Sequence, residues 1–306
     1  MNRYEELSAL VAVVEHGSFS AAAEHLGLAK SAVSRRVTEL ENRLGVRLLN
    51  RTTRRLNLTE PGRSLHERAV RILADWAEAE QIVSAQAARL SGPLKIATPL
   101  TFGVRYLGPV LAEFARKHPD VRLDVDLSDR EVDLVAEGFD LAIRIGRLSD
   151  SSLVARRLSQ IDMVCVASPD YLARKGQPRT PSELKDHQAF RYTLAGPNRW
   201  RFLDGNGRPH QGRPQDVMTA NNGELIVQAC AEGLGLAILP LFIAHQGIRD
   251  GSLETVLSNY RLEGPGMYLV YPPGRYLSRR VRVFSELMVK HFQDRSPWSD
   301  CPIGGA

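Results

Sequence analysis

Apolar residues in the first half of the N-terminal region repeat at the three- and four-residue steps of amphipathic helices. A first helix is predicted from Tyr4 to His16, with an apolar side made of Leu7, Leu10, Val11 and Val14. A short helix is predicted from Phe19 to Leu26, with Ser18 as its N-cap and Gly27 as its end. A third helix, which ends before Gly45, is predicted from the apolar stripe Val33, Val37, Leu40 and Leu44.

The other face of this third helix is polar and basic near its N-terminal end. It carries Lys30, Ser31, Ser34, Arg35 and Arg36, and Ser18 precedes the neighbouring short helix. A helix with these side chains can enter the major groove of DNA, where arginine binds guanine and serine binds phosphate or base edges. A solvated basic face is the alternative. The Ala-rich short helix and the glycine turn before the basic helix favour a helix-turn-helix that binds DNA.

The distribution of charge supports the same interpretation. Between Lys30 and Arg55 there are eight basic and two acidic residues, a net charge of +6. The whole chain carries +5, so everything outside this segment sums to −1. A positive field confined to one segment is what a phosphate-binding surface requires.

Two short alternating segments, residues 46–49 and 54–58, predict a β-hairpin around a turn at 50–53. Its basic residues, Arg51, Arg54 and Arg55, would reach phosphates or the minor groove. A solvated turn is the alternative. With the three helices, the hairpin would complete a winged helix-turn-helix domain over residues 1–58.

A long helix is predicted over residues 59–90, with Thr59 as its N-cap. Its apolar residues recur at mostly alternating steps of four and three, and a helix this long cannot bury such a seam against a small domain. A second copy of the chain would cover the seam as in a coiled coil. The residues expected to mediate this dimerisation are Leu65, Ile72, Trp76 and Val83. Residues 91–93, Ser-Gly-Pro, have the composition of a hinge.

Beyond the hinge, strand-like and helix-like segments alternate, which predicts a mostly parallel sheet with crossover helices. The strands are expected at 94–98, 121–127 and 140–145, and the helices at 104–117 and 131–137. A long crossing near residue 160 and a return near 266 indicate two subdomains. Subdomain I would comprise residues 94–161 and 267–293, subdomain II residues 162–266, and residues 294–306 would be a disordered tail.

Ligands of open α/β sheets bind beyond the carboxyl ends of the strands. The residues there include Leu100, Thr101 and Phe102, then Ser128, Arg144 and Asn222. Thr101 lies just before a predicted helix, where free backbone N–H groups favour an anion. Arg144 lies on an otherwise apolar strand and needs a carboxylate, either of a ligand or of Asp129 or Asp133. These residues predict a site for a small, anionic effector.

Other function classes lack support in the sequence. The three cysteines form no CxxC pair, so a reduced protein without disulfides is expected. No signal peptide or membrane span is predicted, which favours a cytoplasmic location. The eight histidines lack metal-ligand spacing, Gly233-Leu234-Gly235 lacks a dinucleotide fingerprint, and no catalytic set stands out. We therefore expect no enzyme activity, cofactor or metal, and we expect Cys165 and Cys230 to be core residues.

The segment EELSALVAVVEHGSFSAAAEHLGLAKSAVSRRVTELENRLGVRLLNRTTRRLNLTEPG resembles the N-terminal domain of LysR-type transcriptional regulators. FDLAIRIGRLSDSSLVARRL, ASPDYLARKGQPRTPSEL and AEGLGLAILP are similar to their effector-binding domain, which is built like a type 2 periplasmic binding protein. One departure is Ala29, where the family often has Ser or Thr before the recognition helix, and Ser31 is an alternative cap.

The resemblance implies an α+β multidomain regulator that binds an inverted-repeat promoter site in double-stranded DNA. A small molecule would modulate its conformation, a homodimer or homotetramer would be its assembly, and RNA polymerase is a candidate partner. Two alternatives remain from the sequence. One is a ligand-independent DNA-binding repressor of the same fold, and the other is a cytosolic solute-binding or enzymatic module with an incidental basic N-terminus.

Overall fold

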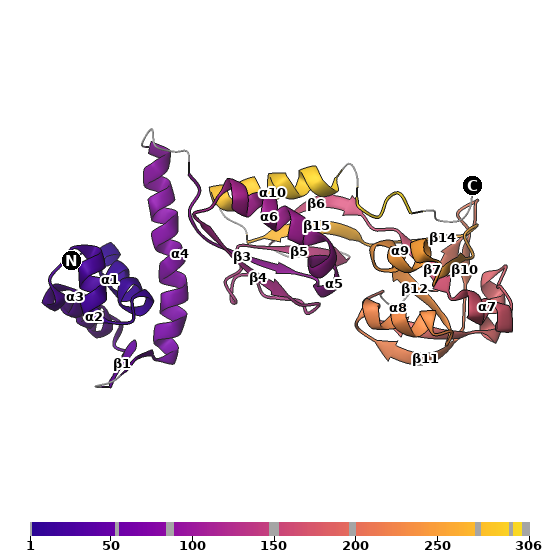
Figure 1. Ribbon diagram of the computed structural model, residues 1–306, viewed down its shortest axis with the longest axis horizontal. Helices are drawn as coiled ribbons and strands as arrows, with labels where there is room; N and C mark the ends of the chain where they lie inside the picture. The colour runs from indigo at the N-terminus through magenta and orange to yellow at the C-terminus, as the bar shows by residue number, and fades with distance from the viewer. Residues whose placement is uncertain are drawn as a thin grey trace. The chain divides into compact units, whose positions relative to one another are not determined.

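The computed structural model describes residues 2–52, 55–83, 89–146, 153–195, 200–272, 277–293 and 296–301, with the backbone alone for 51–52, 55–56, 78–83 and 195. Packing divides the chain into two compact units (Figure 1). The first comprises Met1–Leu94, Ala115–Asp124 and Leu277–Arg280, and the second comprises Lys95–Phe114, Val125–Tyr276 and Val281–Ala306.

The first unit begins with three helices, and the structure confirms all three predictions. They are α1 (Arg3–Glu15), α2 (Phe19–Leu26) and α3 (Lys30–Leu44). Gly27 and Gly45 end α2 and α3 with φ values of +63° and +70°, a conformation that glycine adopts without steric cost. The three helices enclose one apolar core formed by Ala9, Leu10, Ala12, Val13, Ala22, Ala23, Val33, Val37, Leu40, Leu48 and Leu49.

A buried ion pair joins α1 to α3. The side chain of Glu6 is only 3% exposed, and its Oε2 accepts hydrogen bonds from Nε of Arg43 at 3.1 Å and Nη2 at 2.5 Å. A buried carboxylate without such a partner would be strongly destabilising, so the pair fixes how the two helices pack. Glu41 then ties α3 to the next element, because its Oε1 accepts from the backbone N–H of Leu48 and of Leu49.

The predicted hairpin is present, and its strands are β1 (Leu49–Thr52) and β2 (Arg55–Leu58). They are antiparallel with Leu49 opposite Leu58. The prediction that the first strand starts at residue 46 is wrong. Val46 is 42% exposed, and the Glu41 carboxylate holds the N–H groups of residues 48 and 49, so pairing begins only at Leu49. Asn50, Arg51 and Thr52, expected in the turn, therefore lie in the strand.

Helix α4 (Glu60–Val83) begins where the sequence predicts. The Thr59 hydroxyl caps it by accepting from the N–H of Gly62 at 3.0 Å. A side chain at Gly62 would meet the Leu48 carbonyl oxygen at 2.0 Å from its Cβ, so only glycine allows this close contact. The predicted extension to Leu90 is wrong at its end. Arg89 and Leu90 are not helical, and β3 (Gly92–Thr98) starts at the residue that was expected to be a hinge.

Subdomain I is built on a five-stranded sheet in the order β4-β3-β5-β15-β6, most of which belongs to the second unit. The further strands are β4 (Val121–Leu127), β5 (Leu141–Gly146), β6 (Val154–Gln160) and β15 (Gly266–Tyr271). β3 and β5 are parallel, but β15 runs antiparallel to both β5 and β6. β3, β5 and β6 therefore point the same way, as expected of a mostly parallel sheet, and β15 is the reversed strand among these four. The returning strand enters from the other subdomain and pairs in the opposite direction.

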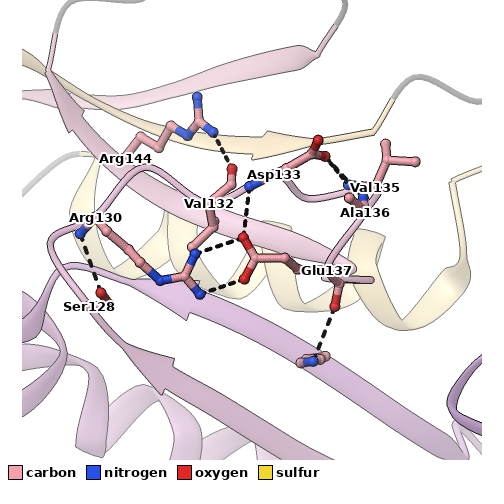
Figure 2. Close-up of polar contacts among 9 residues, drawn as sticks. Ser128, Arg130, Val132, Asp133, Val135, Ala136, Glu137 and Arg144 are labelled. Carbon is pink, nitrogen blue, oxygen red and sulfur yellow. Dashed lines mark hydrogen bonds and ion pairs between the residues drawn. The ribbon is translucent and has the colours of Figure 1, made fainter. Parts of the chain in front are cut away.

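A continuous helical stretch follows β3 as α5 (Leu100–Phe102), the wider π-type turn η1 (Gly103–Leu107) and α6 (Gly108–Lys117). Helix α10 (Arg279–Phe292) follows β15. No helix forms at 131–137, so that prediction is wrong. Asp133 Oδ1 instead accepts from the N–H groups of Val135 and Ala136, and the Glu137 carboxylate accepts from the Asp133 N–H (Figure 2). These side-chain acceptors compete with helical hydrogen bonds and favour a turn.

Subdomain II contains a five-stranded sheet in the order β11-β8-β12-β7-β13. Its elements are β7 (Met163–Ala167), α7 (Pro169–Lys175), η2 (Pro181–Asp186), β8 (Gln188–Tyr192), η3 (Thr193–Ala195), β11 (Gln215–Ala220), α8 (Gly223–Ala231), β12 (Leu236–Pro240), α9 (Leu241–Asp250) and β13 (Glu254–Val256). A smaller sheet, ordered β10-β9-β14, comprises β9 (Arg201–Leu203), β10 (Pro209–Gln211) and β14 (Arg261–Leu262). β8 pairs in parallel with β11 and β12, while β7 is antiparallel to β12 and β13.

The chain passes between the two subdomains twice. It leaves β6 for β7 through Ile161 and Asp162, and it returns through residues 263–265. The two crossings touch, because the Ile161 N–H donates to the Pro265 carbonyl at 2.9 Å. A Cβ on Gly264 would lie 1.7 Å from the Ile161 carbonyl oxygen, so glycine is required there.

The expectation of a disordered tail is wrong for residues 296–301. These residues form a turn in which Trp298 is 3% and Cys301 7% exposed. Among the described residues, no helix is both long and apolar enough to cross a membrane. The same residues contain no group of three or more His, Cys, Asp or Glu side chains placed to hold a metal ion.

Candidate nucleic-acid interface and effector site

The N-terminus of α3 presents the predicted DNA-facing side chains. Ala29 is the N-cap residue and provides no side-chain hydrogen bond, so α3 starts at Lys30 and the alternative cap at Ser31 is wrong. Lys30 and Ser31 are exposed in the first turn, and Ser34 is half-buried one turn later. Side chains in the first turns of a recognition helix are the ones that contact base edges.

Arg35 and Arg36 have different environments although they are adjacent. The Arg35 side chain is 74% exposed, with only a long contact of 3.9 Å from its Nε to Glu39. The Arg36 side chain is 23% exposed and its Nη2 lies 2.7 Å from Oε2 of Glu5 on α1. Arg35 is thus available to a ligand, whereas Arg36 holds two helices together. The sequence pattern placed both arginines on the DNA-facing side, because spacing along a helix does not show which residues of other helices lie nearby.

Of the other predicted DNA contacts, Ser18 has a structural role and the three arginines of the hairpin have no described side chains. Ser18 is the N-cap of α2, and its Oγ accepts from the Ala21 N–H at 3.1 Å. This bond stabilises the first turn of α2 and leaves the hydroxyl able to donate. The side chains of Arg51, Arg54 and Arg55 lie outside the part of the chain that the structure describes. For Arg51 and Arg55 the structure describes the backbone, in β1 and β2.

The predicted dimerisation residues of α4 also differ from one another. Leu65 packs against the core of the three helices, so it belongs to the domain and not to an outer seam. Ile72 and Trp76 are 51% and 54% exposed, and Trp76 contacts the Tyr4 ring with 5.7 Å between centroids. Val83 lies outside the described side chains. Among the described side chains of α4, Ile72 and Trp76 provide the exposed apolar surface.

In the second unit, the predicted anion position at the start of α5 is already used by the protein. The first helical N–H, that of Leu100, donates to Oδ1 of Asp129 at 3.1 Å. Leu100 is 37% and Thr101 6% exposed. Phe102 is completely buried among aromatic rings, so it belongs to the core and does not form an exposed apolar wall.

The turn after β4 is organised by charged side chains (Figure 2). Ser128 Oγ accepts from the Arg130 N–H at 3.3 Å, and the Arg130 guanidinium binds both oxygens of Glu137 at 2.7 and 2.5 Å. The hydrogen bonds from Arg130 lower the pKa of Glu137 from 4.5 to about 2. Lys95 Nζ donates to the Glu137 carbonyl at 3.2 Å and anchors the same turn to β3.

Arg144 has a carboxylate partner within the protein. Its Nη1 binds Oε1 of Glu131 at 3.0 Å, and its Nη2 donates to the carbonyl of Val132 at 2.9 Å. The expected internal partners, Asp129 and Asp133, are therefore wrong. Because the Glu131 side chain is 75% exposed, solvent screens this pair and its free energy is small. A ligand anion could replace Glu131 without leaving a buried charge unpaired.

One ion pair joins side chains of the two subdomains. Arg105 on η1 forms an ion pair with Glu224 on α8, and its Nη1 donates to the Ile243 carbonyl at 3.0 Å. Asn222 caps α8 by accepting from the Leu225 N–H at 3.1 Å. Burial raises the pKa of the Tyr192 hydroxyl, and the negative charges of Asp129 and Glu224 raise it further.

These contacts bring together residues that the sequence missed. Tyr192, whose hydroxyl feels the negative charges of Asp129 and Glu224, was not among the predicted residues, and neither was Glu224. Phe102 and Thr101, which were predicted, are buried. Tyr192 ends β8, a strand that the sequence did not predict. The segment gives a weak signal for a strand because its residues do not alternate. Ala189, Phe190 and Tyr192 are buried, whereas Gln188 and Arg191 are exposed.

The thiols are inert core groups. Cys165 and Cys230 are 3% and 0% exposed, and burial raises the pKa of both, that of Cys230 to about 12. The Cys230 thiol donates to the carbonyl of Gly235 at 3.2 Å. A thiol with a raised pKa contains little thiolate and is a poor nucleophile, which agrees with the sequence interpretation.

Two family descriptions match this chain. Residues 4–63 match "Bacterial regulatory helix-turn-helix protein, lysR family", and residues 87–293 match "LysR substrate binding domain". The chain belongs to the LysR family of bacterial transcriptional regulators. The HTH-type transcriptional regulator CrgA of Neisseria meningitidis serogroup C is 38% identical over 288 residues, which cover 94% of this chain and 96% of that protein. PtxR of Pseudomonas aeruginosa is 38% identical over 286 residues, covering 93% and 91%.

Solved structures of LysR-type regulators support the same fold. The structure of CrgA from Neisseria meningitidis has a TM-score of 0.58 and 37% identity, covering 94% of this chain and 97% of that chain. The full-length virulence activator AphB of Vibrio cholerae has a TM-score of 0.59 and 28% identity, covering 95% and 100%. The expected architecture of a helix-turn-helix domain followed by an effector-binding domain is thus confirmed.

Proposed function

We propose that this regulator binds an inverted-repeat promoter site as a symmetric oligomer, and that a small molecule bound in its C-terminal domain changes that binding. The observation that carries the DNA part is the exposed polar surface at the start of α3. Lys30, Ser31 and Arg35 are exposed there, in the segment of net charge +6. These side chains match what major-groove recognition requires.

Within this surface, Arg35 and Lys30 are proposed to have the direct role. Arg35 would read a base edge, because its guanidinium is exposed and only weakly paired. Ser31, Ser34 and Ser18 would bind phosphate or base edges, and Arg51, Arg54 and Arg55 of the hairpin would bind phosphate or the minor groove. Arg36 would act indirectly, through its ion pair with Glu5, by holding α3 in its orientation.

The oligomer is proposed to form through α4. Ile72 and Trp76 present exposed apolar surface on this helix, and an antiparallel or parallel partner helix would remove it from water. A homodimer is the smallest assembly that would place two α3 helices on an inverted repeat, and a homotetramer would use two such pairs. RNA polymerase is a further proposed partner at the promoter. We propose no catalytic activity.

The effector is proposed to bind beside the strand ends where Ser128, Arg144 and Asn222 lie, with Leu100 as apolar surface and Thr101 behind it. An anionic effector would bind Arg144 by replacing Glu131, since that carboxylate is exposed and gains little from the pair. Asp129 already occupies the N–H of Leu100, so the second predicted anion contact would require Asp129 to move. The guanidinium is therefore the proposed recognition group.

The experiment is nuclease protection of a bound promoter fragment with and without small carboxylates. In the proposed function, one such compound changes the length or spacing of the protected region, and Arg144→Ala removes the change while ligand-free protection persists. The ligand-independent repressor is the second candidate. It predicts the same protection with every compound tested.

A further inference from the structure

The C-terminal turn, residues 296–301, lies beyond the segment 87–293 that matches the family's effector-binding domain. Two of its side chains are nevertheless buried in the protein. Trp298 is 3% and Cys301 7% exposed, although the flanking Pro297, Ser299 and Asp300 face solvent. A segment in an otherwise polar tail that buries its one large side chain must be stabilised by what that side chain contacts.

The Trp298 ring lies against four aromatic rings from both subdomains. Its centroid is 4.8 Å from Tyr106 and 6.4 Å from Phe102, which belong to the helical stretch after β3 in subdomain I. It is 5.6 Å from Phe242 on α9 of subdomain II and 6.2 Å from Phe292 at the end of α10. We call Phe102, Tyr106, Phe242 and Phe292 the aromatic box. Aromatic pairs at such separations are favourable beyond the apolar area that they bury.

Hydrogen bonds reinforce the same junction. The Tyr106 hydroxyl donates to the Phe242 carbonyl at 2.5 Å and lies 3.1 Å from Nδ1 of His245, so it links η1 to α9. The Cys301 thiol donates to the His245 carbonyl at 3.8 Å and fixes the end of the turn to α9. Helices α5 and α9 lie next to each other in Figure 1. Arg105, which precedes Tyr106 on η1, forms the ion pair with Glu224 of α8.

We propose that residues 296–301 form a strap that holds subdomains I and II in one arrangement. In this arrangement the Trp298 ring packs inside the aromatic box. Phe102, Tyr106 and Phe292 come from subdomain I and Phe242 and His245 from subdomain II, so the two groups cannot separate without exposing the indole ring. Any effector that moves one subdomain relative to the other acts against this contact. This last consequence rests on the proposed function, but the strap itself does not.

The test compares two buried tryptophans in the full-length chain. Trp298→Ala removes the indole ring from the aromatic box. Trp200→Ala is the matched control, because Trp200 is 5% exposed and belongs to the apolar core of subdomain II. Nitroxide labels on a genetically encoded ketone amino acid at Val135 and Leu234, which are 63% and 55% exposed, report the separation of the subdomains by pulsed electron spin resonance. Both variants should lower the melting temperature.

The strap predicts that Trp298→Ala alone adds a second, longer separation to the distribution, while Trp200→Ala keeps the single separation of the parent. Tyr106→Phe retains the ring, removes the hydroxyl bonded to Phe242, and should broaden the distribution to a smaller extent even if Trp298→Ala does not fold. An unchanged distribution in Tyr106→Phe and in any folded Trp298 variant would overturn the proposal. A changed separation with an unchanged effect of small carboxylates on promoter protection would keep the strap and refute its regulatory consequence.

Discussion

The guanidinium of Arg36 is bound to the carboxylate of Glu5, with 2.7 Å between Nη2 and Oε2. This contact joins the recognition helix α3 to α1, and it leaves the neighbouring Arg35 as the exposed arginine at the same level of the helix. Two adjacent arginines therefore have different expected roles. One orients the helix, and the other is free to bind bases.

Arg35→Ala should weaken binding to the specific site by ~1–3 kcal/mol and relax the base preference at one position in each half-site. Arg36→Ala should weaken specific and random DNA by similar factors, because it acts through the orientation of α3. Fluorescence anisotropy on specific, single-substituted and random duplexes at fixed salt measures both. Equal losses on all duplexes for Arg35→Ala would refute direct readout by this residue.

Ile72→Glu should dissociate the oligomer without unfolding the chain. Ile72 is 51% exposed on α4, so a charge there can reach solvent in the free subunit but would be desolvated in a helix pair. Sedimentation velocity should give a monomer with greatly weakened promoter binding. Leu65→Glu is the contrasting variant, since Leu65 packs on the N-terminal core and its replacement should lower the melting temperature. An Ile72→Glu protein that remains a dimer would locate the interface elsewhere.

Arg144 and Glu131 provide a paired test of the effector site. Arg144→Ala should abolish stabilisation by an anionic effector, which at a hundred times its dissociation constant amounts to ~2.7 kcal/mol. Arg144→Lys should recover little if the contact is bidentate. Glu131→Gln should tighten binding of the same compound, because it removes the competing carboxylate. Thermal shifts measure all three, and ligand stabilisation that persists in Arg144→Ala would exclude this arginine from the site.

The pair of Arg130 and Glu137 should make stability depend on pH. The pKa of Glu137 is lowered from 4.5 to about 2 in the folded protein, so its stabilising contribution is complete above about pH 5 and is lost as the pH falls toward 2. The difference in melting temperature between the parent and Glu137→Gln should therefore shrink over this interval. A difference that stays constant from pH 5 to pH 2 would mean that the pair does not stabilise the fold.

The helices of the N-terminal domain were predictable because each depends on local signals. The Val33–Val37–Leu40 stripe and the glycines that end α2 and α3 act within a few residues of the helices they define. The partners of individual charges were not predictable. Glu5 and Arg36 are far apart in the sequence. Glu131 is one of several carboxylates close to Arg144 in the sequence, and only the fold selects it as the partner.

The errors in the second unit have the same origin. The segment 131–137 has helical composition, yet the carboxylates of Asp133 and Glu137 bind its backbone and stop a helix. The tail was expected to be disordered because it is a chain terminus beyond the segments that resemble the family. Its Trp298 contacts Phe102 and Tyr106, which lie 190 or more residues away. Such long-range contacts leave no periodic signal in the sequence.

The central claim is that a symmetric oligomer binds an inverted-repeat promoter site. Its most direct test is selection of genomic DNA fragments by the purified full-length protein, followed by nuclease protection of the selected fragments. A symmetric pair of α3 helices predicts a shared inverted repeat, with half-sites one or two helical turns apart and loss of affinity when either half-site is scrambled. Selected fragments without a common repeat, protected no better than random DNA at the same salt concentration, would contradict the account.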